Sequence, residues 1–343
     1  MATVSDLSER ELITRIQQRL PPPPGWLTIG IGDDAAVVEP ERNRLDVLSV
    51  DALVEGVHFD RAFTPPEAIG HRALAVNLSD LAAMGAAPRL CLLSLVLPPA
   101  WPLADFEAMI DGLLRLAGRH RMHVAGGNLA RSPGPLVIDI TVSGTLKRRQ
   151  VSTRGGARPG DELYVSGSIG GAAAGLDMLR EARTRGSHEA AREGAGDEAC
   201  TKRYLYPEPR IRLGQLLARN RAASASVDLS DGLADGVHRL AEASGVGVIV
   251  DADALPIEPA ARTWFAARSN DALGRSVSGG DDYELLFAVR PRTRRRLSAA
   301  ARHGGVPLTR IGVCTEDRAV VLRCGSGESV ADMPLPAGYG HFR

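Results

Sequence analysis

Five short segments of the chain place one or two aspartates directly after a run of apolar, mostly β-branched residues. Such a run is typical of a buried strand, so we expect each segment to deliver its carboxylates to a sheet edge or a cleft. One aspartate in this position is usually a turn residue or a helix cap, and that alternative stays open for each segment taken alone. The segments are Ile29–Asp34, Leu48–Asp51, Val76–Asp80, Val227–Asp231 and Val277–Asp282.

Taken together, the five segments indicate a common site. Converging carboxylates would repel one another unless cations lay between them. Oxygen ligands on short loops suit Mg²⁺ or Mn²⁺. Several such ions are most simply needed to hold the phosphates of a nucleotide, so the pattern predicts magnesium-dependent phosphate chemistry.

Helical and extended periodicities alternate along the rest of the chain. The spacing predicts helices over 8–20, 66–84, 103–120, 172–179, 211–219, 233–243, 260–267 and 292–301. It predicts strands over 46–50, 90–97, 122–128, 136–146, 162–166, 246–250 and 284–289. The glycine-containing, mixed-charge stretch 183–202 is expected to be a mobile surface loop.

The mixture of strands and helices in both halves indicates an α/β or α+β protein. A chain of 343 residues is long enough for two domains. The stretch 154–160 is rich in turn residues and has no apolar period. We therefore expect a first domain over 1–150 and a second over 151–343.

Composition and charge narrow the range of partners. Basic and acidic residues number 41 each, so no overall field favours nucleic acid or an anionic membrane. The longest apolar run, near 90–97, is too short to span a bilayer, and the acidic N-terminus does not resemble a signal peptide. The four cysteines are scattered without zinc or disulfide spacing. We expect a cytoplasmic protein that acts on small molecules.

Common nucleotide and hydrolase motifs are absent from the sequence. It has no G-x-x-x-x-G-K-[ST], no H-R-D or D-F-G, no H-E-x-x-H and no G-x-S-x-G. Lys147 and Lys202 are the only lysines, and neither follows a glycine. Any phosphate must therefore be held by metal-bound aspartates, backbone amides and arginines.

The ordered set of motifs resembles the thiamine-monophosphate kinase family, which belongs with aminoimidazole-ribonucleotide synthetase and selenophosphate synthetase in one superfamily. The matching phrases occur in the family's order and approximate spacing over nearly the whole chain. They are Gly30–Asp34, Asp51–Phe59, Asn77–Gly85, Asp228–Gly232, Gly279–Leu285 and Gly338–Phe342.

The resemblance implies ATP-dependent phosphorylation of thiamine monophosphate to thiamine diphosphate, with several Mg²⁺ ions and direct transfer. It implies an aminoimidazole-ribonucleotide synthetase-like fold and a homodimer whose N-terminal sheets join into a shared barrel. By position, the metal ligands would be Asp34, Ser49, Val50, Asp51, Asp80, Asn128, Asp228 and Asp231. The ATP contacts would be Gly127, Asn128, Arg154 and Ser230, and the thiamine-phosphate contacts His58, Asp281 and Tyr339.

The chain departs from the family pattern at two positions. Asn128 stands where an aspartate is expected; its amide oxygen can ligate Mg²⁺ but carries no charge, so one ion should bind more weakly. Val50 stands where a hydroxyl residue is usual, which leaves only its backbone carbonyl as a ligand.

The sequence leaves three other functions open. A sister ATP-using enzyme could carry the same motifs with another acceptor, although selenophosphate synthetase is disfavoured because the first cysteine is Cys91. A catalytically silent nucleotide-binding protein could have lost a metal through Asn128. A metal-dependent phosphatase would release phosphate without forming an ADP-linked product.

Overall fold

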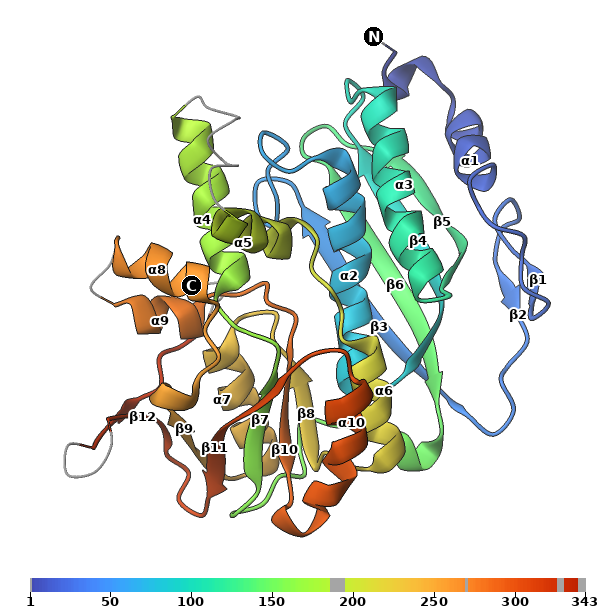
Figure 1. The fold of residues 1–343 in the computed structure, drawn as a ribbon. Coiled ribbons are helices and arrows are strands. Elements are labelled where there is room, and N and C mark those ends of the chain that lie inside the picture. The colour runs from blue at the N-terminus through green and yellow to red at the C-terminus, as the bar shows by residue number, and fades with distance from the viewer. Residues whose placement is uncertain (1, 186–194, 269–270, 326–329, 339–343) are drawn as a thin grey trace. The chain divides into compact units, whose positions relative to one another are not determined.

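The computed structural model describes residues 2–185, 195–268, 271–325 and 330–338. The chain divides into two compact units (Figure 1). Unit 1 comprises Met1–Leu81 and Ala87–Arg148, and unit 2 comprises Ala82–Ala86 and Arg149–Arg343.

Unit 1 combines helices with a four-stranded sheet of order β3-β6-β4-β5. Within this sheet β4 and β5 are parallel, and β6 runs antiparallel to both β3 and β4. Its elements are η1 (Val4–Asp6), α1 (Glu9–Gln17), β1 (Leu27–Ile29), β2 (Val37–Val38), β3 (Leu45–Val54), α2 (Pro66–Met84), β4 (Ala87–Leu97), α3 (Leu103–Arg119), β5 (His123–Arg131) and β6 (Val137–Leu146).

The helices α2 and α3 lie side by side in unit 1 (Figure 1). Two glycines allow the close approach of these helices, because a Cβ at Gly70 would lie 1.9 Å from the carbonyl oxygen of Met109 and one at Gly112 would lie 2.1 Å from that of Glu67. Successive strand side chains point to opposite faces. Along β3 they alternate between half-buried and exposed over most of its length, so one face is covered and the other is open.

Unit 2 is an α+β arrangement around a larger sheet. In the described part of the chain the sheet has seven strands in the order β13-β12-β9-β11-β7-β10-β8. Its elements are β7 (Glu162–Ser166), α4 (Gly171–Thr184), α5 (Ala195–Leu205), α6 (Ile211–Asn220), β8 (Ala225–Asp228), α7 (Leu233–Ser244), β9 (Gly247–Asp251), η4 (Ala252–Ala254), α8 (Pro259–Ala266), α9 (Ala272–Ser278), β10 (Leu285–Val289), η5 (Pro291–Arg296), α10 (Leu297–His303), β11 (Leu308–Thr315), β12 (Val320–Cys324) and β13 (Ala331–Pro334).

The core of unit 2 lies between this sheet and α7. Leu233, Val237 and Leu240 of α7 are fully buried and belong to one cluster with Val165 of β7 and Leu286 of β10. The apolar side chains of α7 recur at helical spacing, so one face of the helix packs on the sheet while the polar face stays outside. This packing places the start of α7 next to the C-terminal end of β8.

The mixed helix and strand class expected from the sequence is confirmed, and most predicted elements are present. Two expectations about the aspartate segments are wrong: Asp80 lies inside α2 rather than after a strand, and Asp281 follows the helix α9. Asp80 lies in a helix because α2 is packed in the interior, where all of Ala73–Ser79 is buried.

The expected loop over 183–202 is also corrected in part. Residues from Ala195 onward form the helix α5, although 186–194 lie outside the described residues. Among the helices that the structure describes, none combines the length and apolar character needed to cross a membrane.

Candidate functional site

Unit 1 brings three of the predicted metal ligands to the junction of β3 and α2. Ser49 and Asp51 are two residues apart on β3, so their side chains share the face that α2 covers. The Ser49 hydroxyl donates a hydrogen bond to the carboxylate of Asp80 on α2. The backbone N–H of Asp51 donates to Oδ1 of Asn77, at 3.1 Å, one helical turn before Asp80. The Ser49 hydroxyl and the carboxylates of Asp51 and Asp80 therefore lie at one half-buried junction between β3 and α2.

Val50 and Asn128 lie on the opposite face of the same sheet. Val50 is 57% exposed and pairs with Thr141 of β6, which pairs in turn with Leu92 of β4. Asn128, on the edge strand β5, pairs with Ser94 of β4. The sheet thus separates the side chains of Val50 and Asn128 from that of Asp80. The Val50 side chain is apolar, so only the backbone carbonyl of Val50 could ligate an ion.

Gly127 occupies a position that only glycine can fill. A Cβ at this residue would lie 1.9 Å from the carbonyl oxygen of Leu93 on β4. The residue is exposed, so its backbone is accessible from solvent. This arrangement suits a backbone contact to a ligand, as predicted for ATP.

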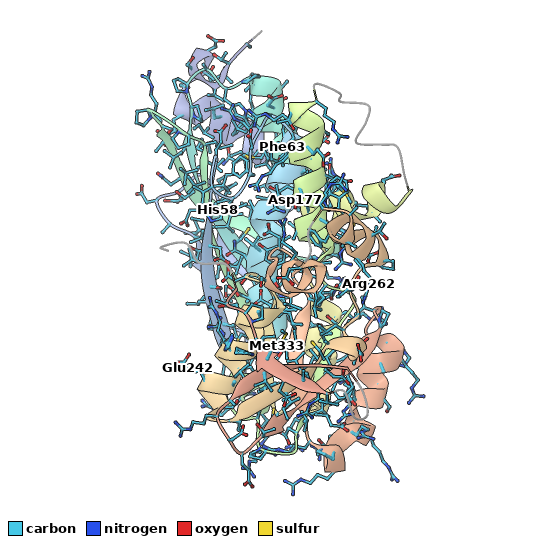
Figure 2. The ribbon with its side chains drawn as sticks, turned by 90° about the vertical axis from the view of Figure 1, so that its left-hand side faces the viewer. His58, Phe63, Asp177, Glu242, Arg262 and Met333 are labelled. Carbon is cyan, nitrogen blue, oxygen red and sulfur yellow. The ribbon has the colours of Figure 1, made fainter. Side chains whose placement is uncertain are left out.

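Two further predicted residues of unit 1 follow strands. His58 lies just beyond the C-terminal end of β3 (Figure 2), where its Nδ1 accepts a hydrogen bond from the backbone N–H of Val54 at 3.0 Å. This contact leaves the ring proton on Nε2. Asp34 is exposed after β1, and its backbone N–H donates to Oδ1 of Asp33 at 2.9 Å.

In unit 2 the loop after β8 and the loop before β10 lie together at one end of the sheet. The two strands are antiparallel, and Asp228 pairs with Leu285. Beyond that pair the backbone N–H of Asp281 donates to the carbonyl of Ser230 at 2.7 Å. Gly232, at φ 96°, allows the close approach, since a Cβ there would lie 2.7 Å from the carbonyl oxygen of Gly279. These contacts gather the predicted residues Asp228, Ser230, Asp231 and Asp281.

The acidic residues of the loop after β8 and the loop before β10 have different electrostatic partners. The carboxylate of Asp231 forms an ion pair with Arg239 of α7, with Nη2 and Oδ2 3.0 Å apart. The same arginine also pairs with Asp235. A cation at Asp231 would therefore have to compete with Arg239. Arg154 is exposed in the segment before β7, and its backbone carbonyl accepts a hydrogen bond from the Ser244 hydroxyl at 3.4 Å.

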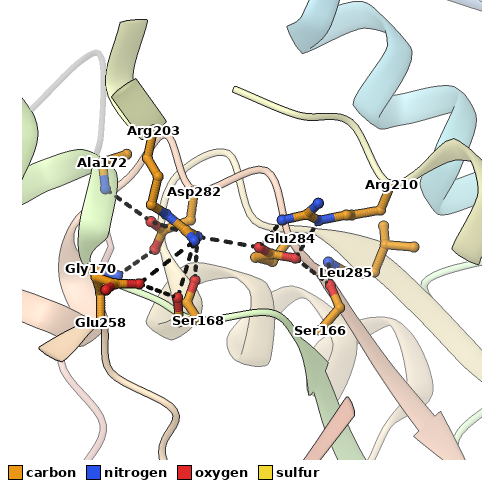
Figure 3. Close-up of polar contacts among 10 residues, drawn as sticks. All are labelled: Ser166, Ser168, Gly170, Ala172, Arg203, Arg210, Glu258, Asp282, Glu284 and Leu285. Carbon is orange, nitrogen blue, oxygen red and sulfur yellow. Dashed lines mark hydrogen bonds and ion pairs between the residues drawn. The ribbon is translucent and has the colours of Figure 1, made fainter. Parts of the chain in front are cut away.

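Behind these loops lies a buried network of charged side chains (Figure 3). Glu284 is fully buried and accepts hydrogen bonds from Nε and Nη2 of Arg210, at 2.7 and 2.5 Å, and from the Ser166 hydroxyl at 2.6 Å. Asp282 accepts from the backbone N–H of Gly170 at 2.6 Å. Burial raises the pKa of Asp282 to about 7, against which Arg203 and the backbone donors lower it.

The donors present suit magnesium, although they form no complete cluster. Hydroxyl and carboxylate oxygens are the ligands that Mg²⁺ prefers, and both the β3–α2 junction and the β8–β10 loops supply them. Among the residues that the structure describes, no three His, Cys, Asp or Glu side chains lie close enough together to hold one ion. The predicted ligands are instead divided between unit 1 and unit 2.

Some residues of the candidate sites in unit 1 and unit 2 were not predicted from the sequence. Asn77 belongs to a matching phrase, and its spacing of three residues from Asp80 on one helix face was a usable signal. Arg203 and Arg210 carried no local signal, because their partners lie about 80 residues away along the chain. The predicted residue Tyr339 lies outside the described residues.

Comparison with known proteins matches one family model to each part of the chain. The model of the AIR synthase related protein, N-terminal domain, matches residues 32–146, and that of the C-terminal domain matches 158–325. The thiamine-monophosphate kinase of Escherichia coli (strain K12) is 38% identical, with 92% of this chain and 92% of that protein covered.

Solved structures give the same result. The thiamine-monophosphate kinase from Stenotrophomonas maltophilia K279a has a TM-score of 0.77 at 39% identity, with 91% of this chain and 94% of that chain covered. AaThiL complexed with AMPPCP and TMP has a TM-score of 0.75 at 29% identity, covering 100% of this chain and 99% of that one. The chain therefore belongs to the AIR synthase related superfamily and, within it, to the thiamine-monophosphate kinase family, which confirms the resemblance.

Proposed function

We propose that this protein transfers the γ-phosphoryl group of ATP to thiamine monophosphate, forming thiamine diphosphate and ADP. The observation that carries the proposal is the match to thiamine-monophosphate kinases along nine-tenths of the chain, in sequence and in structure. A similar structure holds AMPPCP, an ATP analogue, together with TMP. The matching motifs of this chain are those of its β3–α2 junction and its β8–β10 loops.

The chemistry asks little of the protein beyond positioning. The acceptor is itself a phosphate, which is nucleophilic at neutral pH, so no strong general base is needed. Catalysis then consists of holding two anionic groups in line and neutralising the charge between them. Bound Mg²⁺ supplies that positive charge. Burial raises the pKa of the Cys91 and Cys314 thiols to about 12, so these two groups stay protonated at neutral pH.

The residues of this chain fall into three groups under the proposal. The carboxylates and Ser49 position the ions, backbone and arginine groups contact ATP, and a third set contacts the thiamine phosphate. The ion-holding set is Asp34, Ser49, Asp51, Asp80, Asp228 and Asp231, with Asn128 and the Val50 carbonyl as weaker donors. Gly127, Asn128, Arg154 and Ser230 serve ATP, and His58, Asp281 and Tyr339 serve thiamine monophosphate. In domain terms, we propose that 1–150 binds metal and ATP and forms the dimer, and that 151–343 is an α/β domain that contributes the remaining ligands.

A homodimer is part of the same proposal. The open face of the unit 1 sheet exposes large apolar side chains: Leu48 is 72% exposed, Val50 57% and Leu92 39%. Apolar side chains at neighbouring positions on one sheet face favour burial against a partner. The same open face of a second copy of the chain is an apolar surface that could cover it. Two open faces turned toward each other would enclose a shared barrel.

Within one copy, Asn128 lies far from Asp51. Asp51 is on the edge strand β3 and Asn128 on the opposite edge strand β5. Three strand spacings separate these edges, which is roughly 14 Å. One ion cannot span that distance, so a single copy does not bring both side chains to it.

We also place the protein in the cytoplasm. All four cysteines are free thiols, as expected in a reducing compartment. ATP, the proposed phosphoryl donor, is abundant there.

The test is an assay with ATP, excess Mg²⁺ and thiamine monophosphate, in which thiamine diphosphate and ADP are separated by chromatography. Equal and chelator-sensitive formation of both products is the expected result. The Asp80→Asn variant should stay folded by circular dichroism and lose turnover by about 100-fold or more. ATP binding without thiamine diphosphate, or phosphate release without it, would contradict the proposal.

A further inference from the structure

The segment that carries Asp281 has an unusual backbone. Asp281 has φ 68° and Tyr283 has φ 49°, both in the left-handed region that residues other than glycine seldom adopt. Two such residues within three positions persist only when their surroundings hold them in place. Conformations of this kind concentrate at ligand-binding sites, so the contacts that hold the segment are informative.

Two acidic residues, Asp282 between these positions and Glu284 directly after them, anchor the segment in the interior (Figure 3). Asp282 accepts hydrogen bonds from the backbone N–H groups of Gly170 and Ala172, at 2.6 and 3.2 Å. Glu284 is held by Arg210 and by the Ser166 hydroxyl. These side chains are buried and fully engaged, so their role is to hold the backbone.

Asp281 and Tyr283 are instead joined to each other. The Tyr283 hydroxyl donates a hydrogen bond to Oδ1 of Asp281 at 3.0 Å. The backbone N–H of Tyr283 donates to the carbonyl of Leu229 at 2.9 Å, and the whole residue is only 6% exposed. The phenol is therefore fixed by packing, and it limits rotation of the Asp281 carboxylate.

We infer that Tyr283 is a positioning residue that orients the Asp281 carboxylate toward the cationic substrate. The inference rests on the proposed function, in which Asp281 contacts thiamine monophosphate. Thiamine carries a positive thiazolium ring and an aminopyrimidine, and an oriented carboxylate attracts such groups more strongly than a rotating one. The hydroxyl holds one carboxylate oxygen by donating a hydrogen bond to it. Tyr283 thus sets the affinity for the acceptor without touching it.

The test compares Tyr283→Phe with a matched control, Tyr164→Phe. Tyr164 also donates its hydroxyl to a carboxylate two residues earlier, Glu162 Oε2 at 3.1 Å, but within β7. For Tyr283→Phe we expect KM for thiamine monophosphate to rise about tenfold, as for loss of one hydrogen bond to a charged group. KM for ATP and kcat should change less than about threefold. The control should alter none of the three.

A double-mutant cycle adds a readout that a purely structural role would not move. In an Asp281→Asn background, Tyr283→Phe should have no further effect on KM, because the two residues act as one unit.

Several results would overturn the inference. It fails if Tyr283→Phe leaves KM for thiamine monophosphate unchanged, or if it raises both KM values equally. It also fails if the effect persists in the Asp281→Asn background. If Tyr283→Phe does not fold, the Asp281→Asn variant still tests the inference. An unchanged KM for thiamine monophosphate in Asp281→Asn rejects it. Absence of thiamine diphosphate formation by the unmodified protein would instead reject the proposed function.

Discussion

The backbone N–H of Asp51 donates a hydrogen bond to Oδ1 of Asn77, and Nδ2 of Asn77 donates to the carbonyl oxygen of Ala73, both at 3.1 Å. One fully buried amide thus joins the edge strand β3 to α2. Because Asp51 is a proposed ion ligand and Asp80 lies one turn further along α2, this amide sets the distance between two carboxylates.

Replacing Asn77 by leucine should therefore affect both stability and magnesium use. The variant leaves the Asp51 amide without its acceptor, which should cost about 1–3 kcal/mol of unfolding free energy. It should also raise the Mg²⁺ concentration for half-maximal activity by about tenfold. Chemical denaturation and magnesium titration of the assay measure the two effects. Gln215→Leu, which removes a part-buried amide bond to the Ala86 carbonyl, is the control and should leave magnesium use unchanged.

Restoring a carboxylate at position 128 should tighten magnesium binding. Asn128→Asp adds a charge to a ligand that already has a suitable oxygen, so the Mg²⁺ requirement should fall about tenfold. Asn43→Asp adds the same charge at an exposed site in unit 1 and should leave the requirement as it is. An unchanged or weaker magnesium dependence in Asn128→Asp would show that this side chain holds no ion.

Asp282 should make stability fall as pH rises. Burial raises its pKa from 3.8 to about 7, so across this range the folded chain keeps a proton that the unfolded chain has lost. The unfolded state then binds fewer protons, and the free energy of unfolding decreases with pH through the window, by about 4 kcal/mol for this group. Asp282→Asn should remove this decrease.

The pH prediction is measured by denaturant unfolding at pH 4.5, 6 and 8. The expected result is that the variant gains stability relative to the unmodified protein as pH rises. Asp332→Asn, at an exposed carboxylate, should give a nearly constant difference instead. Parallel curves for Asp282→Asn and the unmodified protein would contradict the buried, proton-holding role.

Two arginine–carboxylate pairs allow a direct comparison of buried and exposed charge. Arg210 binds Glu284 through two hydrogen bonds, with the carboxylate side chain 0% exposed. Arg323 binds Asp332 in the same way, but both side chains are about two-fifths exposed. Arg210→Met should cost about 3 kcal/mol of stability because a buried charge loses its main partner. Arg323→Met should change stability far less, because solvent screens the exposed pair, and equal costs would refute the comparison.

The open face of the unit 1 sheet predicts the effect of a charge there. Leu48→Asp should convert a homodimer into monomers in sedimentation velocity, because the carboxylate would have to be buried without a partner. Met333→Asp, at a residue 49% exposed on β13, is the control and should remain dimeric. A Leu48→Asp protein that sediments like the unmodified dimer would place the interface elsewhere.

The sequence alone determined the chemical inventory of this protein and much of its secondary structure. The helix predicted from residue 8 is present, and the capping box of Ser8 and Glu11 at its start depends only on neighbours along the chain: the Ser8 N–H donates to Glu11 Oε2 at 2.8 Å. The order of the aspartate motifs was likewise enough to indicate the family.

Tertiary structure alone decided how those residues are used. Asp80 reaches Ser49 from within a helix, and Val50 and Asn128 lie on the other face of the sheet from Asp80. Of two adjacent aspartates, Asp282 is buried as an anchor while Asp281 bonds to Tyr283. The physical reason is that burial and pairing depend on contacts between distant parts of the chain, which local patterns do not encode.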